Sequence, residues 1–247
     1  MKKLKVAIIG HGKMGRMIED ILIERGHDVV CVIDENNTED FTSPAFASAD
    51  VAIEFTRPAS AVDNILKAFA AKVPVVSGTT GWTDSLPELK EMCAQGKGAL
   101  LWSSNFSLGM NMFMAVNRHL AKLMEGFTGY APSMEEVHHV HKVDHPSGTA
   151  ITLAEDIIAC NRNVKSWKEC AEGEIAKGNE LPITAIRQGE VPGIHAVTWD
   201  SDADEIIITH SAKNRHGFAM GAVLAAEWLA ANSKGFGFYT MKDVLGF

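Results

Sequence analysis

The sequence has little of several features that mark whole classes of protein. Among its 247 residues there are four cysteines, two tyrosines, and fewer lysines and arginines (23) than aspartates and glutamates (31), which gives a formal net charge of −8. The cysteines are scattered and form no CxxC pair, which argues against a disulfide framework or a thiol redox motif and favours a reducing compartment. The acidic balance argues against a nucleic-acid partner, because backbone binding requires clustered lysine and arginine.

Long apolar runs are also missing. No window approaches the roughly 18 apolar residues of a membrane span, and the apolar stretch at the N-terminus ends at Gly10, too soon for a signal peptide. We therefore expect a cytoplasmic protein with no membrane partner. Hydrophobic residues make up 46% of the chain, which is typical of a globular protein, and its length allows two modest domains.

The first hundred residues alternate between two patterns. Short apolar runs, rich in β-branched residues, predict strands buried on both faces, and apolar residues at helical spacing predict helices between them. The expected strands are 6–9, 29–33, 51–55, 73–76 and 99–102, and the expected helices are 14–24, 60–71 and 86–93. This alternation predicts an α/β fold with a doubly wound parallel sheet of the Rossmann type.

A different pattern follows residue 107. Helices are expected over 108–124 and 150–159, and strand patterns at 183–188, 195–199 and 205–210 predict an antiparallel meander in an open sheet. We expect the apolar helix at 218–229 to return to the first domain. The predicted organisation is a dinucleotide-binding Rossmann domain over 1–107 and 216–247, and an α+β domain with a largely antiparallel sheet over 108–215.

A glycine-rich segment connects the first expected strand to the first helix. Gly10-His11-Gly12-Lys13-Met14-Gly15 fits G-x-G-x-x-G in the strand-turn-helix context that this motif requires. Glycines let the backbone approach a pyrophosphate, and the helix start offers free N–H groups and a partial positive charge. Asp34 ends the second strand, where a carboxylate can accept hydrogen bonds from a ribose diol. These features favour a nicotinamide dinucleotide site over a glycine turn without a ligand.

The residues near Asp34 bear on the choice of dinucleotide. Glu35 follows Asp34, and two acidic residues would repel the 2′-phosphate of NADPH. Lys13 in the glycine loop acts in the opposite direction, because it could reach that phosphate. We expect NADH as the main cofactor and NADPH as a second one.

The segment from residue 136 to residue 150 is the most informative. Four of the ten histidines fall within eight residues here, and Lys142 lies among them. Histidine can deliver a proton near neutral pH, and lysine can bind a carboxylate or act as an acid. Ser147-Gly148-Thr149 precedes an expected helix whose free N–H groups would suit a carboxylate. The pattern predicts proton transfer beside an anionic substrate.

Residues 138–150, HHVHKVDHPSGTA, resemble the signature of the 4-hydroxy-tetrahydrodipicolinate (dihydrodipicolinate) reductase family of the diaminopimelate–lysine pathway. The resemblance covers most of the chain and includes the glycine loop and the segments 55–58, 78–81, 104–107, 187–189, 192–195 and 218–222. It implies NAD(P)H-dependent reduction of a cyclic, dianionic small molecule by a homotetramer built through the second-domain sheets. The chain departs from the family pattern in a shorter glycine loop containing His11, a short segment between residues 34 and 50, and the acidic Glu35.

The resemblance also implies roles for individual residues. His138 would be the proton donor and acceptor, and Lys142 a proton donor. The carboxylates of the substrate would be held by His139, Ser147, Gly148 and Thr149. The adenosine side of the cofactor would be held by Gly10, His11, Gly12, Lys13, Met14 and Asp34. The nicotinamide half would lie along Gly78, Thr79, Thr80, Ser103, Ser104, Asn105 and Phe106.

Other interpretations stay open on the sequence alone. A histidine cluster can bind a metal, but we expect none here, because no H-E-x-x-H spacing appears. If the segment is a strand, His138 and His139 would also point to opposite faces. A dinucleotide-sensing regulator would share the Rossmann half without needing an acid–base cluster. Another Rossmann dehydrogenase, such as an aspartate-type enzyme, would bind NAD but ignore a cyclic imine precursor. We expect Asp144 to be a structural partner of nearby Lys and His, and assign no role to His195 or His210.

Overall fold

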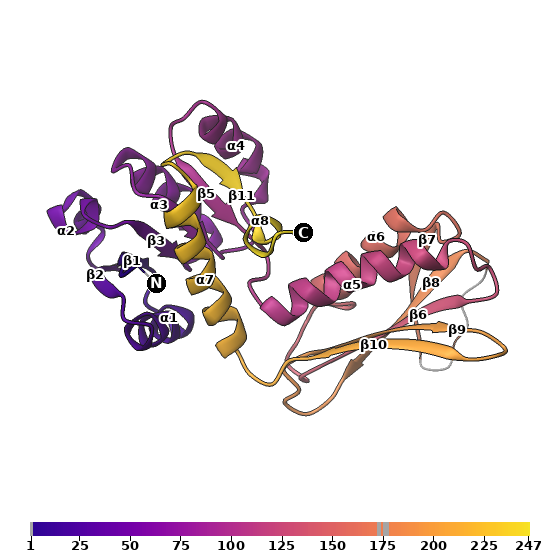
Figure 1. Ribbon diagram of the computed structural model, residues 1–247. Coiled ribbons are helices and arrows are strands. Elements are labelled where there is room, and N and C mark those ends of the chain that lie inside the picture. The colour runs from indigo at the N-terminus through magenta and orange to yellow at the C-terminus, as the bar shows by residue number, and fades with distance from the viewer. Residues whose placement is uncertain (1, 172–173, 175–177) are drawn as a thin grey trace. The chain divides into compact units, whose positions relative to one another are not determined.

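The chain forms two compact units in the computed structural model, which describes residues 2–171, 174 and 178–247 (Figure 1). The first unit comprises Met1–Leu108 and His216–Phe247, and the second comprises Gly109–Arg215. Each unit has its own sheet and its own buried apolar side chains. No helix in the described part of the chain combines the length and the apolar character needed to cross a membrane.

The first unit is built on a six-stranded parallel sheet with the strand order β11-β5-β4-β3-β1-β2. Its strands are β1 (Lys5–Ile9), β2 (Asp28–Ile33), β3 (Val51–Glu54), β4 (Val75–Ser77), β5 (Ala99–Trp102) and β11 (Gly237–Tyr239). The chain starts at β1 inside the sheet and extends it in both directions, which is the doubly wound arrangement. The predicted Rossmann class is confirmed, and β11 is an edge strand that the sequence patterns did not predict.

Helices cover both faces of this sheet because successive strand residues alternate between them. Ile8 and Ile53 pack with α1 and α7, whereas Ile9 and Ala52 pack with α3 and α4. The expected return of the helix at 218–229 is confirmed, because α7 lies in the core of the first unit. The helices of this unit are α1 (Lys13–Glu24), α2 (Pro44–Ala47), α3 (Pro58–Ala70), α4 (Leu86–Ala94), α7 (His216–Asn232) and α8 (Met241–Leu245), with 3-10 turns at Thr38–Thr42 and Thr83–Ser85.

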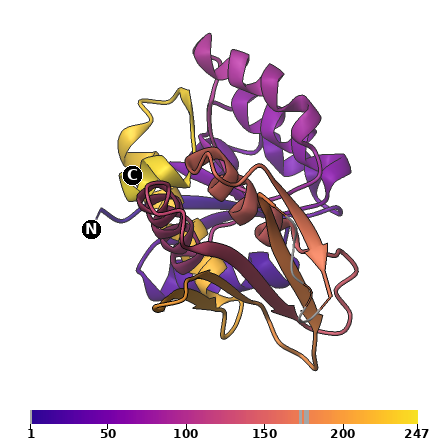
Figure 2. The same ribbon diagram turned by 90° about the vertical axis from the view of Figure 1, so that its right-hand side faces the viewer.

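The second unit is a five-stranded sheet with two helices, α5 and α6, on one face (Figures 1 and 2). Met134, Ile183 and Val197 of the sheet pack against Phe113 of α5 and Leu153 of α6. The strand order is β10-β9-β6-β8-β7. The elements are α5 (Leu108–Met124), β6 (Ala131–His138), α6 (Gly148–Cys160), β7 (Ser166–Cys170), β8 (Glu180–Arg187), β9 (Ile194–Asp200) and β10 (Glu205–Ser211).

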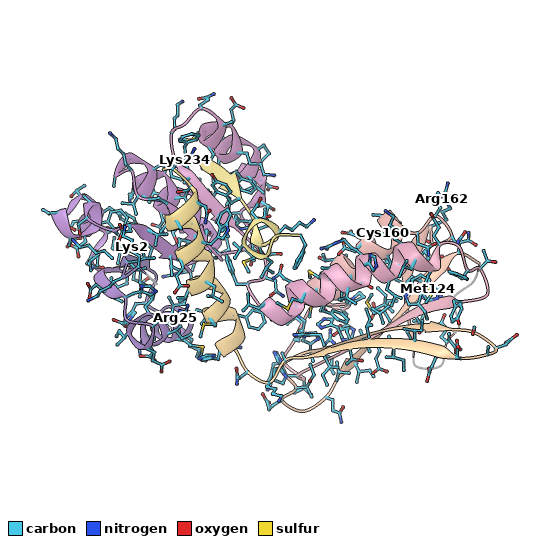
Figure 3. All side chains as sticks on the ribbon, in the orientation of Figure 1. Lys2, Arg25, Met124, Cys160, Arg162 and Lys234 are labelled. Carbon is cyan, nitrogen blue, oxygen red and sulfur yellow. The ribbon has the colours of Figure 1, made fainter. Side chains whose placement is uncertain are left out.

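Polar contacts fasten the two helices of the second unit to each other. Arg118 of α5 pairs with Asp156 of α6 at 2.9 Å. Beyond the helix ends, near Met124, Arg162 pairs with Glu125 at 2.8 Å (Figure 3). Together with the apolar packing, these contacts hold α5 and α6 against one face of the sheet. The acid–base segment lies on that face.

The order of the second sheet corrects one prediction. β9 and β10 form the expected antiparallel hairpin, but β8 does not lie beside β9. β6 is inserted between them, antiparallel to β9 and parallel to β8, so the sheet is mixed and the predicted meander is wrong at that step. The reason is that β6, with the sequence APSMEEVH, buries a glutamate and a histidine on one face, and apolar periodicity does not detect such a strand.

Candidate active site

The glycine loop lies at the carboxyl end of β1 and is packed tightly from behind. Gly10 has a φ of +96°, and a Cβ atom there would lie 2.1 Å from the carbonyl oxygen of Phe55. A Cβ on Gly15 would lie 2.0 Å from the carbonyl oxygen of Gly10. Gly12, by contrast, faces open space, with nothing within 4 Å of its Cβ position. The loop therefore fits against β3 and α1 while its front stays accessible to a ligand.

A cavity of about 680 Å³ opens beside this loop, a volume in the range of small-molecule sites. Its walls are the loop, the end of β2, the segment after β3 and the first turns of α3. Among the described residues that line it are Gly10, His11 and Gly12, but not Lys13 or Met14. No side chain caps the N-terminus of α1, whose first turn has no acidic residue, so its N–H groups are available to an anion.

Two acidic residues at the end of β2 also line the cavity. Asp34 is exposed, and its Oδ1 accepts a hydrogen bond from the N–H of Asn36 at 2.7 Å, which holds the carboxylate at the strand end. Glu35 forms an ion pair with Arg57, a cavity residue that the sequence patterns did not assign to the site. The acidic charge of Glu35 is therefore partly offset by a cation that lines the same cavity.

The loops expected along the nicotinamide half meet at the carboxyl edge of the same sheet. A Cβ on Gly78 would lie 2.1 Å from the Phe55 ring, which in turn lies 5.8 Å from the Phe106 ring between centroids. Thr79 donates its hydroxyl to Glu54 at 2.8 Å, and Glu54 is fully buried. Thr80, Ser103, Ser104 and Asn105 belong to the same two loops. Glu54 is thus a support of the 78–80 loop that the sequence did not reveal.

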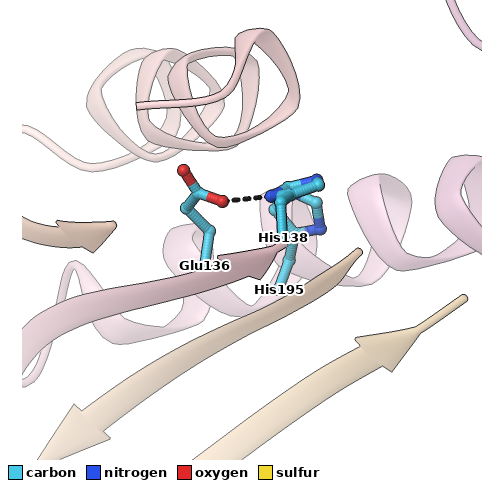
Figure 4. A group of neighbouring side chains, drawn as sticks. All are labelled: Glu136, His138 and His195. Atoms are coloured by element: carbon cyan, nitrogen blue, oxygen red, sulfur yellow. Dashed lines mark hydrogen bonds and ion pairs between the residues drawn. The ribbon is translucent and has the colours of Figure 1, made fainter. Parts of the chain in front are cut away.

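In the second unit, a buried carboxylate lies beside the expected proton donor. Glu136 and His138 are two residues apart on β6 and share its helix-covered face, and Glu136 is directly opposite His195 of β9 (Figure 4). One Glu136 oxygen bonds His138 Nδ1. The other accepts hydrogen bonds from Arg187 Nη2 and from the N–H of Ser147, both at 3.0 Å.

A second set of contacts connects Lys142 to the same helix start. Lys142 Nζ pairs with Asp144 Oδ1 at 2.7 Å, and Asp144 Oδ2 accepts a weak hydrogen bond from the N–H of Gly148 at 3.3 Å. Asp144 is therefore the partner of the lysine, as expected. Ser147 caps α6, because its Oγ accepts from the N–H of Ala150 at 3.2 Å. His138 and Lys142 are thus both linked, through one carboxylate each, to the first turn of α6.

Comparisons with known proteins identify the family to which both halves of the chain are similar. Residues 4–106 match the model of the dihydrodipicolinate reductase N-terminus, and residues 109–245 match that of its C-terminus. The chain is 44% identical to the 4-hydroxy-tetrahydrodipicolinate reductase of Christiangramia forsetii, over 98% of both chains. It is 37% identical to that of Archaeoglobus fulgidus, over 98% of this chain and 100% of the relative.

The chain belongs to the dihydrodipicolinate reductase family. It is accordingly an NAD(P)H-dependent oxidoreductase, as the glycine loop and the acid–base segment predicted. The structure of a dipicolinate-bound dihydrodipicolinate reductase from Paenisporosarcina sp. TG-14 superposes with a TM-score of 0.77 at 21% identity, covering 97% of this chain and 98% of that one. That likeness extends to both halves of the fold.

The buried groups of this dihydrodipicolinate reductase family member have shifted pKa values. Burial by itself would raise the pKa of Glu136, but hydrogen bonds from His138, Arg187 and the Ser147 N–H outweigh it and lower the pKa to about 2. Burial, with a contribution from nearby His138, lowers the pKa of His195 to about 4. At neutral pH Glu136 is therefore an anion and His195 is uncharged.

Three residues of the acid–base site were missed by the sequence reasoning. Glu136 and His195 face each other across β6 and β9, and Arg187 is paired with His138 in the register of β8. His195, to which no role was given, lies 5.1 Å from His138 between ring centroids. The spacing of Glu136 and His138 was a usable signal, because residues two apart on a strand share a face. It was unused because β6 had not been recognised.

The arrangement of Glu136, His138 and His195 raises the question of whether these side chains bind a metal ion. Ligand atoms of Glu136, His138 and His195 lie within 4.8 Å of one another, a separation that would suit an ion. The carboxylate, however, already accepts hydrogen bonds from Arg187, Ser147 and His138. A positively charged donor on the carboxylate disfavours a cation beside it. The absence of a metal stays a prediction.

Proposed function

We propose that this family member reduces 4-hydroxy-tetrahydrodipicolinate, the substrate named for its relatives. The reaction would convert this dianion, a reduced nicotinamide dinucleotide and a proton into tetrahydrodipicolinate, the oxidised dinucleotide and water. The observation that carries the proposal is that two proton-bearing side chains are each connected, through a carboxylate, to the start of one helix. His138 through Glu136 and Lys142 through Asp144 are both tied to the first turn of α6. Two proton-bearing groups beside an anion-binding helix start suit reduction of a ring dicarboxylate.

The residues of the first unit fit a nicotinamide dinucleotide. The open side of Gly12 and the uncapped start of α1 would hold the pyrophosphate, and Asp34 would accept hydrogen bonds from the adenosine ribose. The loops 78–80 and 103–106 would border the nicotinamide half. When bound, the dinucleotide supplies the hydride, and the protein orients it.

His138 would hold the proton at Nε2. Its Nδ1 is occupied by Glu136, which leaves Nε2 as the ring nitrogen for the substrate. A Cβ on Gly193 would lie 3.0 Å from this Nε2, so the glycine keeps that side of the ring accessible. Transfer of a proton to the ring atom that gains negative charge would contribute on the order of 10²–10⁴-fold to the rate.

The substrate carboxylates would be held by Lys142, His139, Gly148 and Thr149. Gly148 faces open space at its Cβ position and begins α6. The buried Nδ1 of His139 has no hydrogen-bond partner among the described residues, so a small rotation of the ring toward a bound ligand would satisfy it. The N–H and hydroxyl of Ser147 are engaged within the protein, so we assign Ser147 to the support of this turn.

We propose NADH as the preferred cofactor, with NADPH also used. Asp34 is suited to a ribose diol and would repel a 2′-phosphate, which supports NADH. Arg57 lines the same cavity and offsets Glu35, which supports some use of NADPH. The ratio of kcat/KM for the two dinucleotides measures this preference directly.

We also propose a homotetramer that uses the helix-free face of the second sheet. Ile207 of β10 is 52% exposed on this face and lies opposite Thr198 of β9. Ala196 of β9 and Glu135 of β6 are paired with each other and share this face. An open sheet face with an exposed isoleucine suits burial against another copy. Light scattering of the eluted protein would give the mass, and a monomer at micromolar concentration would contradict this proposal. The cytoplasmic location stays a prediction.

The reaction is tested by mixing the purified protein with the condensation product of aspartate semialdehyde and pyruvate. Oxidation of NADH and NADPH is followed separately, with Lys142→Ala beside the unaltered protein. Rapid oxidation that is strongly reduced in the variant would support the proposal. Dinucleotide binding without oxidation would contradict it and would favour a sensor or a dehydrogenase of another substrate.

A further inference from the structure

Among the described residues of the second unit, three histidines pair with carboxylates, and one of these pairs differs from the others. His141 with Glu190 and His145 with Glu169 are exposed, at 3.1 and 2.9 Å. The pair of His138 with Glu136 is buried, and its carboxylate is fully inaccessible to solvent. An exposed pair of this kind contributes little, because water competes for both partners. A buried one fixes the orientation and the tautomer of its histidine.

We propose that Glu136 is a positioning residue that orients His138 and fixes which of its ring nitrogens faces the substrate. The inference rests on the proposed role of His138 as proton donor and adds a residue to it. Glu136 Oε2 accepts the hydrogen bond from Nδ1–H, so the second ring nitrogen, Nε2, is the one that gains and loses a proton. Both oxygens of Glu136 are engaged by protein groups, so it would act on the substrate only through His138.

The other oxygen of Glu136 makes its position rigid. Oε1 receives hydrogen bonds from Arg187 on β8 and from the Ser147 N–H at the start of α6. These donors keep the carboxylate ionised, in line with its pKa of about 2. The same side chain therefore holds the proton donor on one oxygen and the turn of the carboxylate site on the other. Proton donor and anion site are fixed relative to each other by a single group.

The proton step can be stated for this arrangement. Once the 4-hydroxyl group has left as water, the hydride would add to the resulting double bond of the ring, the Nε2–H bond of the His138 imidazolium would break, and its proton would go to the ring atom that receives the electron pair. The neutral ring keeps Nδ1–H on Glu136, which remains an anion throughout. The groups facing His138 are Glu136 on its own strand, Arg187 on β8 and His195 on β9, and the charge of Lys142 in the loop acts on His195. His195 stays uncharged beside it, so it does not compete for the carboxylate.

Glu136→Gln tests the proposal with little change of volume. The glutamine carbonyl can still accept from Arg187 and Ser147, but its NH₂ group would face Nδ1 and donate to it, which reverses the tautomer. We expect kcat to fall by about 10²-fold or more, with little change in KM, because the carboxylate site is kept. Glu136→Asp, which retains the charge, should recover part of that loss. The matched control is Glu169→Gln, which removes an exposed histidine partner in the same unit and should leave kcat unchanged.

Three further results make the test decisive. In a His138→Gln background, Glu136→Gln should add almost nothing to the loss of kcat, because it acts through that ring. Nitrogen-15 NMR of labelled histidine should show the His138 signals, assigned by their absence in His138→Gln, changing to the Nε2–H tautomer in Glu136→Gln. Retention of wild-type kcat and tautomer in a folded Glu136→Gln, or an additive loss in the double variant, would overturn the proposal. Full activity of His138→Gln would instead refute the proposed function, so the two failures are distinguishable.

Discussion

The glycine-loop site of the first unit and the acid–base site of the second are built from different parts of the chain. The first is made of backbone: a left-handed glycine, an open glycine and a free helix start. The second is made of side chains, and its central group, Glu136, is a carboxylate with no exposed surface. A site made of backbone groups tolerates substitution of most nearby side chains, but it does not tolerate substitution of the glycines that shape the loop. Side-chain sites depend on the charge state of a few buried groups, so they respond to pH and to single-atom substitutions.

The largest expected effect is on the side-chain site. His138→Gln should lower kcat by about 10²–10⁴-fold, because the ring that delivers the proton is removed. Dinucleotide affinity, measured by the change in NADH fluorescence, should stay at the wild-type value, because no residue of the first unit changes. A loss of NADH affinity equal to the loss of rate would show that the two sites are not separable.

The second effect is a loss of stability between pH 6.5 and 4.5 that should affect the second unit more than the first. The folded-state pKa of His195 is lowered to about 4 from 6.5, so below pH 6.5 the unfolded chain takes up a proton that the folded chain resists. Stability should therefore fall as the pH is lowered from 6.5 toward 4, by up to about 3 kcal/mol. Glu136, whose pKa is lowered from 4.5 to about 2, extends the loss below pH 4.5.

Hydrogen exchange read by mass spectrometry would check this prediction. Amides of β6 and β9 should exchange faster at pH 5 than at pH 7 after correction for the intrinsic rate, whereas those of β1 and β3 should not. His195→Gln should abolish the difference between pH 6.5 and pH 4.5. Equal acceleration in both sheets would contradict the assignment to His195.

The third effect distinguishes Gly10, which should matter for stability, from Gly12, which should matter for dinucleotide binding. Gly10→Ala should destabilise the protein by about 1–3 kcal/mol, because its Cβ would meet the Phe55 carbonyl oxygen at 2.1 Å. Gly12→Ala should leave stability nearly unchanged but weaken NADH binding, because its methyl group would enter the open space in front of the loop. Urea unfolding and NADH titration of both variants measure this, and identical behaviour would show that the open space is not used.

The smallest effect concerns cofactor choice. Glu35→Ala removes a negative charge from the cavity and frees Arg57, so the KM for NADPH should fall several-fold, as expected for about 1 kcal/mol. The KM for NADH should change less. The control is Glu39→Ala, an exposed acidic residue outside the cavity lining, which should alter neither value. A parallel fall in both KM values would point to a general charge effect.

The two regions also differ in how far the sequence revealed them. The strands β1 to β5, the glycine loop and Asp34 could be predicted, because the parallel sheet shows as apolar runs and the motif sits between a strand and a helix. β6 was missed, because its buried face carries Glu136 and His138 and so shows no apolar alternation. Missing that strand led to the wrong neighbour for β8, and it hid Arg187 and His195, which come together only through strand register.

In the second site, the resemblance to a known family predicted more of the residues than periodicity and motif spacing did. It named His138 and Lys142, and the structure ties each to the start of α6. It offered no reason for Glu136, whose importance shows only once burial and hydrogen bonding are known. Burial of a charge depends on residues distant in sequence, here Ser147 and Arg187, so it cannot be read from local periodicity.

Measuring hydride transfer to the substrate ring most directly tests the proposal that the first unit binds the dinucleotide and the second unit supplies the proton. The protein would be mixed with the condensation product of aspartate semialdehyde and pyruvate and with NADH carrying deuterium at the transferable position of C4. We predict that the product gains the deuterium in step with NADH oxidation, and that His138→Gln binds NADH normally but forms almost no labelled product. NADH oxidation without deuterium in the product, or unimpaired labelling by His138→Gln, would contradict the assignment.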